Sequence, residues 1–144
     1  MGTRRRWLGW VALIGVGALA SAGVIGCGPD PPDAPTVTAL ADYSIHLSAT
    51  PVHLGTNAFV IQNGGTVEHE FIGFKIDRPV AQLARTPDGD LDEDVLTKVT
   101  DGDNLQPGID QTRVVNLTEA GMYLFVCNLP GHFAKGMYTE VRLP

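Results

Sequence analysis

The sequence predicts an all-β domain, an antiparallel β-sandwich, preceded by an export leader. Several short stretches alternate between apolar and polar residues, which is the period of a half-buried strand. Turn residues separate these stretches, and 17 glycines among 144 residues suit a turn-rich fold. Short alternating strands with turns between them are typical of an antiparallel sandwich, and the length fits one domain plus a leader.

Residues 1–26 have the composition of a signal peptide. Three arginines, Arg4 to Arg6, precede an uncharged stretch from Trp7 to Ile25 that is rich in Gly and Ala. Val24-Ile-Gly-Cys27 resembles a bacterial lipobox, in which the Cys is lipidated and becomes the new N-terminus, and Thr3 to Leu8 also resembles a twin-arginine signal. The alternative is an uncleaved membrane helix, because the stretch is just long enough to span a bilayer. Both arrangements predict a domain tethered at the periplasmic or cell-surface face of a bacterial membrane.

A Pro-rich tether is expected over residues 27–39. Gly28 to Thr36 contain four Pro and two Asp, a composition that favours extended backbone and cannot build a core. We therefore expect the folded domain to span residues 40–144.

The first strands are expected around a strong turn signal. Tyr43 to Ala49 alternate, and Thr56 to Gln62 form the next strand. Asn63-Gly64-Gly65 suits a tight turn because Asn and Gly accept positive φ, so Val67 to Ile76 should be the hairpin partner.

The segment from 78 to 110 is less regular. Pro79 to Ala84 suit a helical turn, and Gln106-Pro-Gly108 suits a turn. Asp88 to Asp94 hold five acids in seven positions; a solvated loop is the ordinary interpretation, and a partner-docking patch is the alternative. The remaining strands are expected at Gln111–Leu117, Met122–Cys127 and Met137–Leu143.

A short loop near the C-terminus carries the chemistry. Cys127, His132 and Met137 offer a thiolate, an imidazole and a thioether, with four residues between each pair. A thiolate with an imidazole suits copper or zinc, and the thioether favours copper. A blue-copper site has two His, one Cys and a weak axial Met, so a second His must come from elsewhere. His69 is the candidate, because it shares the apolar face of its predicted strand.

Each ligand residue has an ordinary explanation when taken alone, such as packing for Cys or Met, and only the joint spacing favours a metal site. Two further His are not expected to bind the metal. His46 lies opposite the apolar face of its strand, and His53 lies near the turn at Pro51.

This order of ligands, together with Gly121-Met-Tyr before the Cys, resembles the cupredoxin family over residues 40–144. The loop spacing is similar to that of auracyanin and rusticyanin and longer than that of plastocyanin. The resemblance implies a Greek-key sandwich with one type 1 copper per chain. Its ligands would be His69, Cys127, His132 and Met137.

The resemblance also implies how the site is supported. The backbone N–H of Glu70 should donate to the Cys127 sulfur. Many relatives have Asn at the position of Glu70, where its side chain ties the two ligand loops together, so this chain departs from the pattern. Pro130 has no N–H and removes one donor near the thiolate. The edge of His132 should reach the surface within an apolar patch for partner docking, formed by Leu129, Pro130, Phe133 and Ala134.

We therefore expect an electron-transfer protein and not an enzyme, with redox partners such as cytochromes or membrane oxidoreductases and a lipid anchor in the membrane. Without residues 1–26 the chain has 7 basic and 16 acidic residues, which argues against nucleic acid binding. A copper carrier or chaperone is one alternative, although such proteins usually expose Met-rich or Cys-x-x-Cys ligands. A copper-enzyme fragment is another, but those enzymes place a His beside the Cys, and here Val126 and Asn128 flank it.

Overall fold

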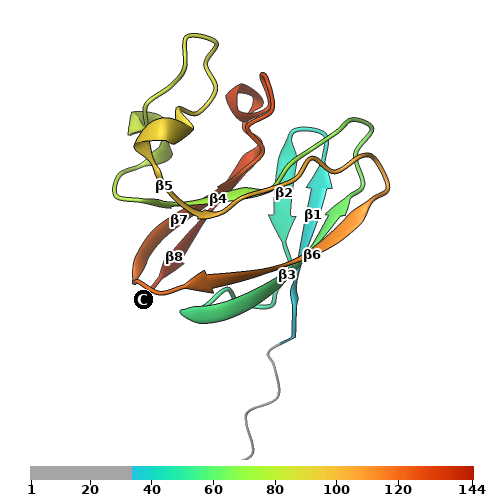
Figure 1. Cartoon of the computed structure of the whole chain (residues 1–144), viewed down its shortest axis with the longest axis vertical. Helices are drawn as coiled ribbons and strands as arrows, with labels where there is room; N and C mark the ends of the chain where they lie inside the picture. Colours follow the sequence, from blue (N-terminus) through green and yellow to red (C-terminus); the bar gives the residue numbers. More distant parts are fainter. Residues whose placement is uncertain (1–33) are drawn as a thin grey trace, which may run out of the picture. The chain divides into compact units, whose positions relative to one another are not determined.

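The computed structural model describes residues 34–144, which form two four-stranded sheets (Figure 1). The predicted leader, the lipobox and the first part of the tether lie outside the described residues. The strands are β1 Thr36–Ala41, β2 Ser44–Leu47, β3 Gly55–Asn63, β4 Ile72–Ile76, β5 Thr97–Thr100, β6 Asp110–Leu117, β7 Gly121–Val126 and β8 Tyr138–Leu143. Three short 3₁₀ helices are η1 Val80–Gln82, η2 Glu93–Val95 and η3 Phe133–Lys135.

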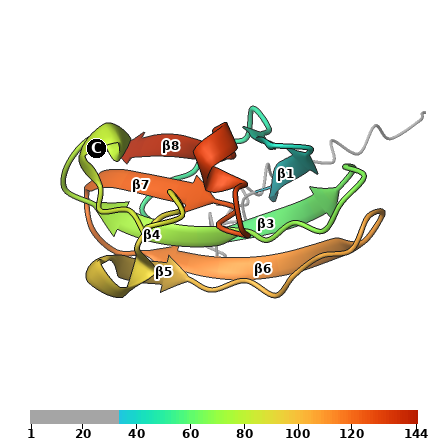
Figure 2. The same ribbon diagram turned by 90° about the horizontal axis from the view of Figure 1, so that it is seen from above.

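The strand order is β2-β1-β3-β6 in the first sheet and β5-β4-β7-β8 in the second. Figure 2 shows β8, β7, β4 and β5 one below another in this order. This arrangement confirms the all-β sandwich. The first sheet is mixed, because β1 runs parallel to β3 and antiparallel to β2. The second sheet is antiparallel, and β7 lies inside it between β4 and β8. β1 begins at Thr36, so the sandwich includes residues that we expected in the tether.

The core between the sheets is aromatic. The rings of Phe71 and Phe125 stack with their centroids 5.0 Å apart and their planes 5° from parallel, and Phe59 is tilted against both. Cys127 and Met137 belong to the same buried cluster and are fully buried. The core therefore extends to the end of the sandwich where the Cys and Met lie.

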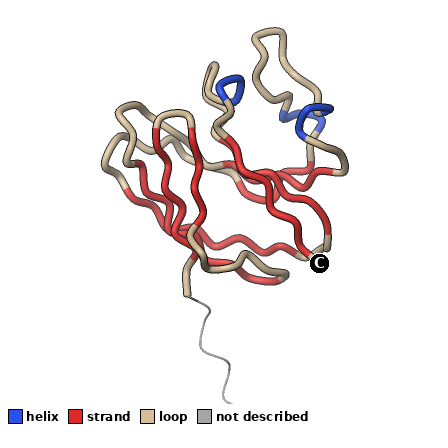
Figure 3. Tube along the Cα trace, turned by 180° about the vertical axis from the view of Figure 1, so that it is seen from behind, coloured by secondary structure: helices blue, strands red, loops and turns tan. Residues whose placement is uncertain are grey.

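The second sheet is covered on its other face as well. A second buried cluster joins side chains of β4 and β7 to the segment that carries η1 and η2, and it includes Leu91 and Phe133. This explains why neither β4 nor β7 shows a clean alternation of buried and exposed residues. Figure 3 shows the helical turns at the same end of the sheets.

The predicted hairpin around Asn63–Gly65 is wrong. The Asn63 side chain does close a tight loop, because its Oδ1 accepts from Gly65 N at 2.9 Å. However, β3 belongs to the first sheet and β4 to the second, so the intervening residues cross between sheets. Between β3 and β4, His69 is buried, whereas Val67, two residues earlier, is 39% exposed. The two side chains therefore do not lie on one face, as alternate residues of a strand would.

The other local predictions agree with the structure in several places. Pro79–Ala84 contains η1, and Gln106 O accepts from Ile109 N at 3.1 Å in a turn with Gly108 at φ 76°. Among residues 34–144, no helix is long and apolar enough to cross a membrane.

Candidate metal centre

Backbone hydrogen bonding positions two of the predicted ligands, Cys127 and His69. Cys127 follows the last residue of β7, an inner strand of the second sheet. His69 forms a two-way bridge with Leu105, in which His69 N donates to Leu105 O at 3.0 Å and Leu105 N donates to His69 O at 2.7 Å. Both side chains are fully buried. These ligands therefore project from backbone that is hydrogen-bonded to neighbouring segments.

The third ligand comes from the loop after β7. His132 is half-buried, and its Nδ1 lies 3.2 Å from Cys127 Sγ and 3.2 Å from His69 Nδ1. Cys127 Sγ lies 3.9 Å from His69 Nδ1. The point equidistant from these three atoms is about 2 Å from each, close to the bond length from an imidazole nitrogen to a metal ion of this size. The donor set therefore fits a trigonal copper site.

Met137 completes the donor set from within the core. Its side chain is fully buried, and its backbone is tied to both other ligands of the loop. Cys127 N donates to Met137 O at 3.1 Å, and Met137 N donates to His132 O at 3.2 Å. Gly136, at φ 92°, ends η3 in the left-handed region and lets the chain return. The four predicted ligands match a type 1 copper site, in which Met137 would be the weak fourth donor.

The surroundings of Cys127 favour the neutral thiol over the thiolate unless a metal ion is bound. Burial raises the pKa of Cys127, although the backbone N–H groups of Glu70 and Leu129 act in the opposite direction. Burial also lowers the pKa of His132, assisted by the neighbouring His69. A neutral imidazole is the form that binds metal, and a bound cation stabilises the thiolate.

Glu70 connects the two ligand segments. Its backbone N–H lies 3.4 Å from Cys127 Sγ, in agreement with the resemblance. Its side-chain Oε1 accepts from Asn128 N at 2.8 Å. The Glu70 carboxylate therefore joins the two ligand segments, as the Asn side chain does in many relatives. Glu70 follows His69 directly, so an alternating strand would place it on the opposite, polar face, but it is only 9% exposed. Burial raises the pKa of this carboxyl, although the hydrogen bond from Asn128 opposes that effect.

The acidic segment from Asp88 to Asp94 is not simply a solvated loop. Asp90 is 8% exposed, and both of its carboxylate oxygens lie 3.0 Å from Gly131 N. Asn128 accepts from Leu91 N at 2.8 Å, and its Nδ2 donates to Leu91 O at 3.0 Å and to Glu93 Oε1 at 2.9 Å. The segment therefore braces the loop that carries His132. The sequence shows the acids but not this contact, because the two segments are about forty residues apart.

The predicted docking patch is only partly at the surface. Pro130 and Ala134 are exposed, and Leu129 is half-buried against the core. Phe133 is 1% exposed, so placing it in the patch was wrong. It packs in the cluster on the outer face of the second sheet, beneath the guanidinium of Arg85, which lies 4.2 Å from its ring centroid.

Sequence reasoning also missed the turn between β1 and β2. The Tyr43 ring meets the His132 ring edge-on, with centroids 5.2 Å apart, and Lys135 Nζ lies 3.7 Å from the Tyr43 ring. Asp42 Oδ1 lies 3.4 Å from His69 Nε2. No motif in this turn could have indicated any of these three contacts.

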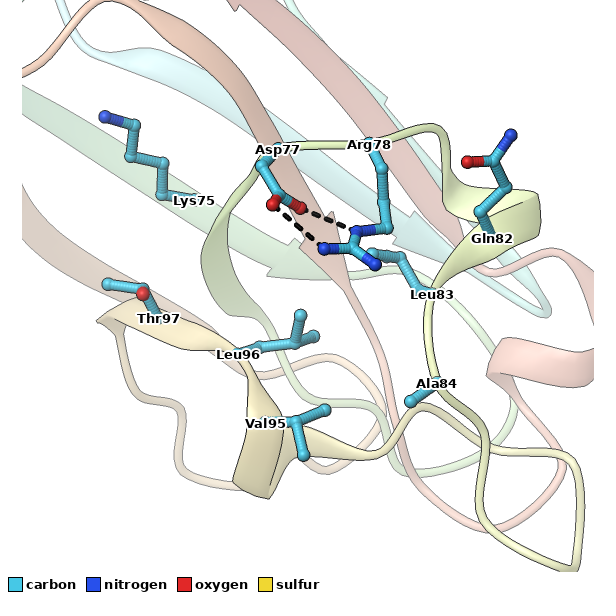
Figure 4. A pocket seen from close by; sticks show the side chains of 9 residues that line it. All are labelled: Lys75, Asp77, Arg78, Gln82, Leu83, Ala84, Val95, Leu96 and Thr97. Carbon is cyan, nitrogen blue, oxygen red and sulfur yellow. Dashed lines mark hydrogen bonds and ion pairs between the residues drawn. The ribbon is translucent and has the colours of Figure 1, made fainter.

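The other histidines lie away from the donor cluster. Across residues 34–144, the group of potential metal-binding side chains consists of His69, Cys127 and His132. His46 is exposed on β2, and the Nδ1 of His53 lies 2.7 Å from Leu54 O. A hollow of about 360 Å³ beside η1 and β5 has no His or Cys in its lining, as Figure 4 shows.

Comparisons with known proteins agree with this site. Residues 52–144 match the family described as copper binding proteins, plastocyanin/azurin family. A dithionite-reduced auracyanin from the photosynthetic bacterium Roseiflexus castenholzii is 23% identical, with a TM-score of 0.57 over 75% of this chain and 94% of that one. Auracyanin A, a "blue" copper protein from the green thermophilic photosynthetic bacterium Chloroflexus aurantiacus, is 16% identical, with a TM-score of 0.54 over 77% and 100%. Rusticyanin from Thiobacillus ferrooxidans is 20% identical, with a TM-score of 0.50 over 76% and 75%. No curated protein matches the chain.

Proposed function

The chain belongs to the plastocyanin/azurin family of copper-binding proteins, and from that premise we propose that it carries single electrons between redox proteins outside the cytoplasm. When held by His69, Cys127, His132 and Met137, copper would supply the chemistry, which is one-electron exchange between Cu(I) and Cu(II). One electron enters from a donor protein and one leaves to an acceptor. Auracyanin A, which shares the fold, is itself a "blue" copper protein.

The observation that carries this proposal is the convergence of Cys127 Sγ with two imidazole nitrogens inside a buried, hydrogen-bonded frame. With Met137 as a fourth donor, the protein fills the ligand positions of a blue-copper site and leaves none for a substrate. This favours an electron carrier over an enzyme. It also favours a carrier of electrons over a carrier of copper, because metal delivery needs ligands that exchange readily.

The protein's contribution is to keep its ligands in place. Cu(I) and Cu(II) prefer different geometries, so a frame that holds one compromise arrangement reduces the rearrangement that accompanies electron transfer. The bridge of His69 to Leu105, the tie from Glu70 to Asn128 and the brace of Asp90 on Gly131 all serve this purpose.

Electrons would pass through His132, the half-buried ligand. Pro130 and Ala134, each two residues from His132 in the sequence, are exposed, and the rings of Tyr43 and His132 meet at 84°. A small surface of this kind suits brief encounters with a partner such as a cytochrome or a membrane oxidoreductase.

An optical redox titration of the purified, copper-loaded protein tests the proposal. We expect an intense visible band from the Cys thiolate on Cu(II) that bleaches reversibly with one electron per copper. A protein that stays colourless with bound copper, or that releases copper on reduction, would support a copper carrier instead.

Membrane attachment through a lipid on Cys27 is part of the proposal and rests on the lipobox-like sequence. Several acyl chains would hold the domain firmly, because each buried CH₂ contributes about 0.8 kcal/mol. Replacing Cys27 with Ala should block lipidation and processing of the leader. Mass spectrometry that finds Cys27 unmodified in the mature native protein would refute the anchor.

A further inference from the structure

The turn between β1 and β2 places one side chain against each imidazole of the copper site. Asp42 contacts His69, and Tyr43, the next residue, contacts His132. Tyr43 has φ 64°, a conformation that a residue other than Gly rarely adopts. Such a conformation persists only where its surroundings hold it, so the turn is a specific feature of this site.

The Asp42 carboxylate is held in place by the loop that leads to His69. Its Oδ1 accepts from Thr66 N at 2.8 Å, and its Oδ2 accepts from Thr66 Oγ1 at 2.6 Å. These hydrogen bonds hold the pKa of Asp42 below its usual range, the Thr66 hydroxyl having the largest effect. The Asp42 side chain is 37% exposed, and a partly exposed carboxyl group is negatively charged at neutral pH.

Gly65 makes room for this contact. A Cβ at this position would lie 2.5 Å from Asp42 Oδ1 and 2.7 Å from His69 Nε2, closer than side chains allow. Gly65 thus lets the carboxylate approach the outer nitrogen of the imidazole.

The orientation of the His69 ring determines which of its nitrogens faces Asp42. Its Nδ1 faces Cys127 and His132, so Nδ1 must be unprotonated to bind copper and Nε2 must carry the proton. Nε2 then donates to Asp42 Oδ1 at 3.4 Å. A carboxylate in this position fixes the tautomer and the ring orientation of a ligand His and makes the imidazole a stronger donor.

We propose that Asp42 is a positioning residue of the copper site, which holds His69 through Nε2–H and favours oxidised copper. The inference rests on the copper site, and its importance for electron transfer rests on the proposed function. A fixed negative charge near the metal stabilises Cu(II) more than Cu(I) and so lowers the reduction potential. At a partly exposed position, neutralising the charge should change the equilibrium constant for reduction about three- to tenfold.

The test is the reduction potential of Asp42→Asn, measured against the unaltered protein. Asn is the same size and keeps an acceptor for Thr66, so the main change is the charge. We expect a rise equivalent to that three- to tenfold change, about 30–60 mV for a one-electron couple. The matched control is Asp77→Asn, which removes a carboxylate just after the end of β4 that lies away from Cys127. An Asp42→Asn potential no higher than that of the control would overturn the proposal.

A second measurement decides the matter if Asp42→Asn does not load copper. In the unaltered Cu(I) protein, long-range ¹H–¹⁵N spectra should show His69 protonated at Nε2, with a proton that exchanges slowly with water. Rapid exchange of that proton would show that Asp42 does not hold it. The proposed function is judged separately, by whether the unaltered protein shows a reversible one-electron couple.

Discussion

Replacing Asn128 with Ala removes the side chain that joins the ligand loop to the segment 91–93. Three hydrogen bonds are lost, two to the backbone of Leu91 and one to Glu93 Oε1. Leu91 is 1% exposed, so its N–H is left without a partner in a buried position. The unsatisfied buried donor costs about 1–3 kcal/mol and each of the other two lost hydrogen bonds about 0.5–1.5 kcal/mol, so we expect a total loss of about 2–6 kcal/mol.

Urea unfolding of the metal-free protein measures this loss. With an m-value of about 1–3 kcal/mol/M, the midpoint should fall by about 1 M or more while m stays constant. The copper-loaded variant should keep its visible band, because the four ligands are intact. Asn104→Ala is the control at an exposed asparagine and should change the free energy of unfolding by less than about 0.5 kcal/mol. A similarly small effect of Asn128→Ala would show that the brace contributes nothing in solution.

Three further substitutions test Glu70, which lies beside the copper site, and the ligand Met137. Glu70→Ala should lower the free energy of unfolding by about 1–3 kcal/mol, because Asn128 N loses its acceptor. Glu70→Gln keeps an oxygen at this position and should lower it by less. Equal losses for the two variants in urea unfolding would argue against the hydrogen bond between Glu70 and Asn128. Met137→Gln should lower the reduction potential while copper stays near one per chain, because an amide oxygen stabilises Cu(II) better than a thioether does. An unchanged potential at full copper loading would mean that Met137 only fills the core.

Three of the four ligands could be predicted because they lie close together in the sequence, where their spacing can be recognised without knowing the fold. Cys127, His132 and Met137 lie close together in the sequence. A thiolate, an imidazole and a thioether at such short spacing have few explanations other than copper binding. His69 was found because a His on an apolar stretch needs a partner. His69 is buried, as a residue on an apolar face should be, but it precedes β4, which covers only the second half of the strand predicted over Val67 to Ile76.

The features that were missed depend on contacts between distant segments. Asn63–Gly65 does make a tight loop, but a turn signal says nothing about whether the next strand pairs with the previous one or enters another sheet. Phe133 follows a surface ligand in the sequence, yet the outer face of the second sheet buries it. Asp42 and Asp90 resemble ordinary surface acids, and only the fold brings them to the ligand segments.

The most direct test of the copper site is the visible spectrum of the copper-loaded protein with and without the Cys127 thiol. The unaltered protein should bind one copper per chain and show an intense visible band that disappears on reduction. Cys127→Ser removes the thiolate but keeps His69 and His132, so the band should be absent even where copper remains bound. A band of undiminished intensity in Cys127→Ser would contradict the site described above.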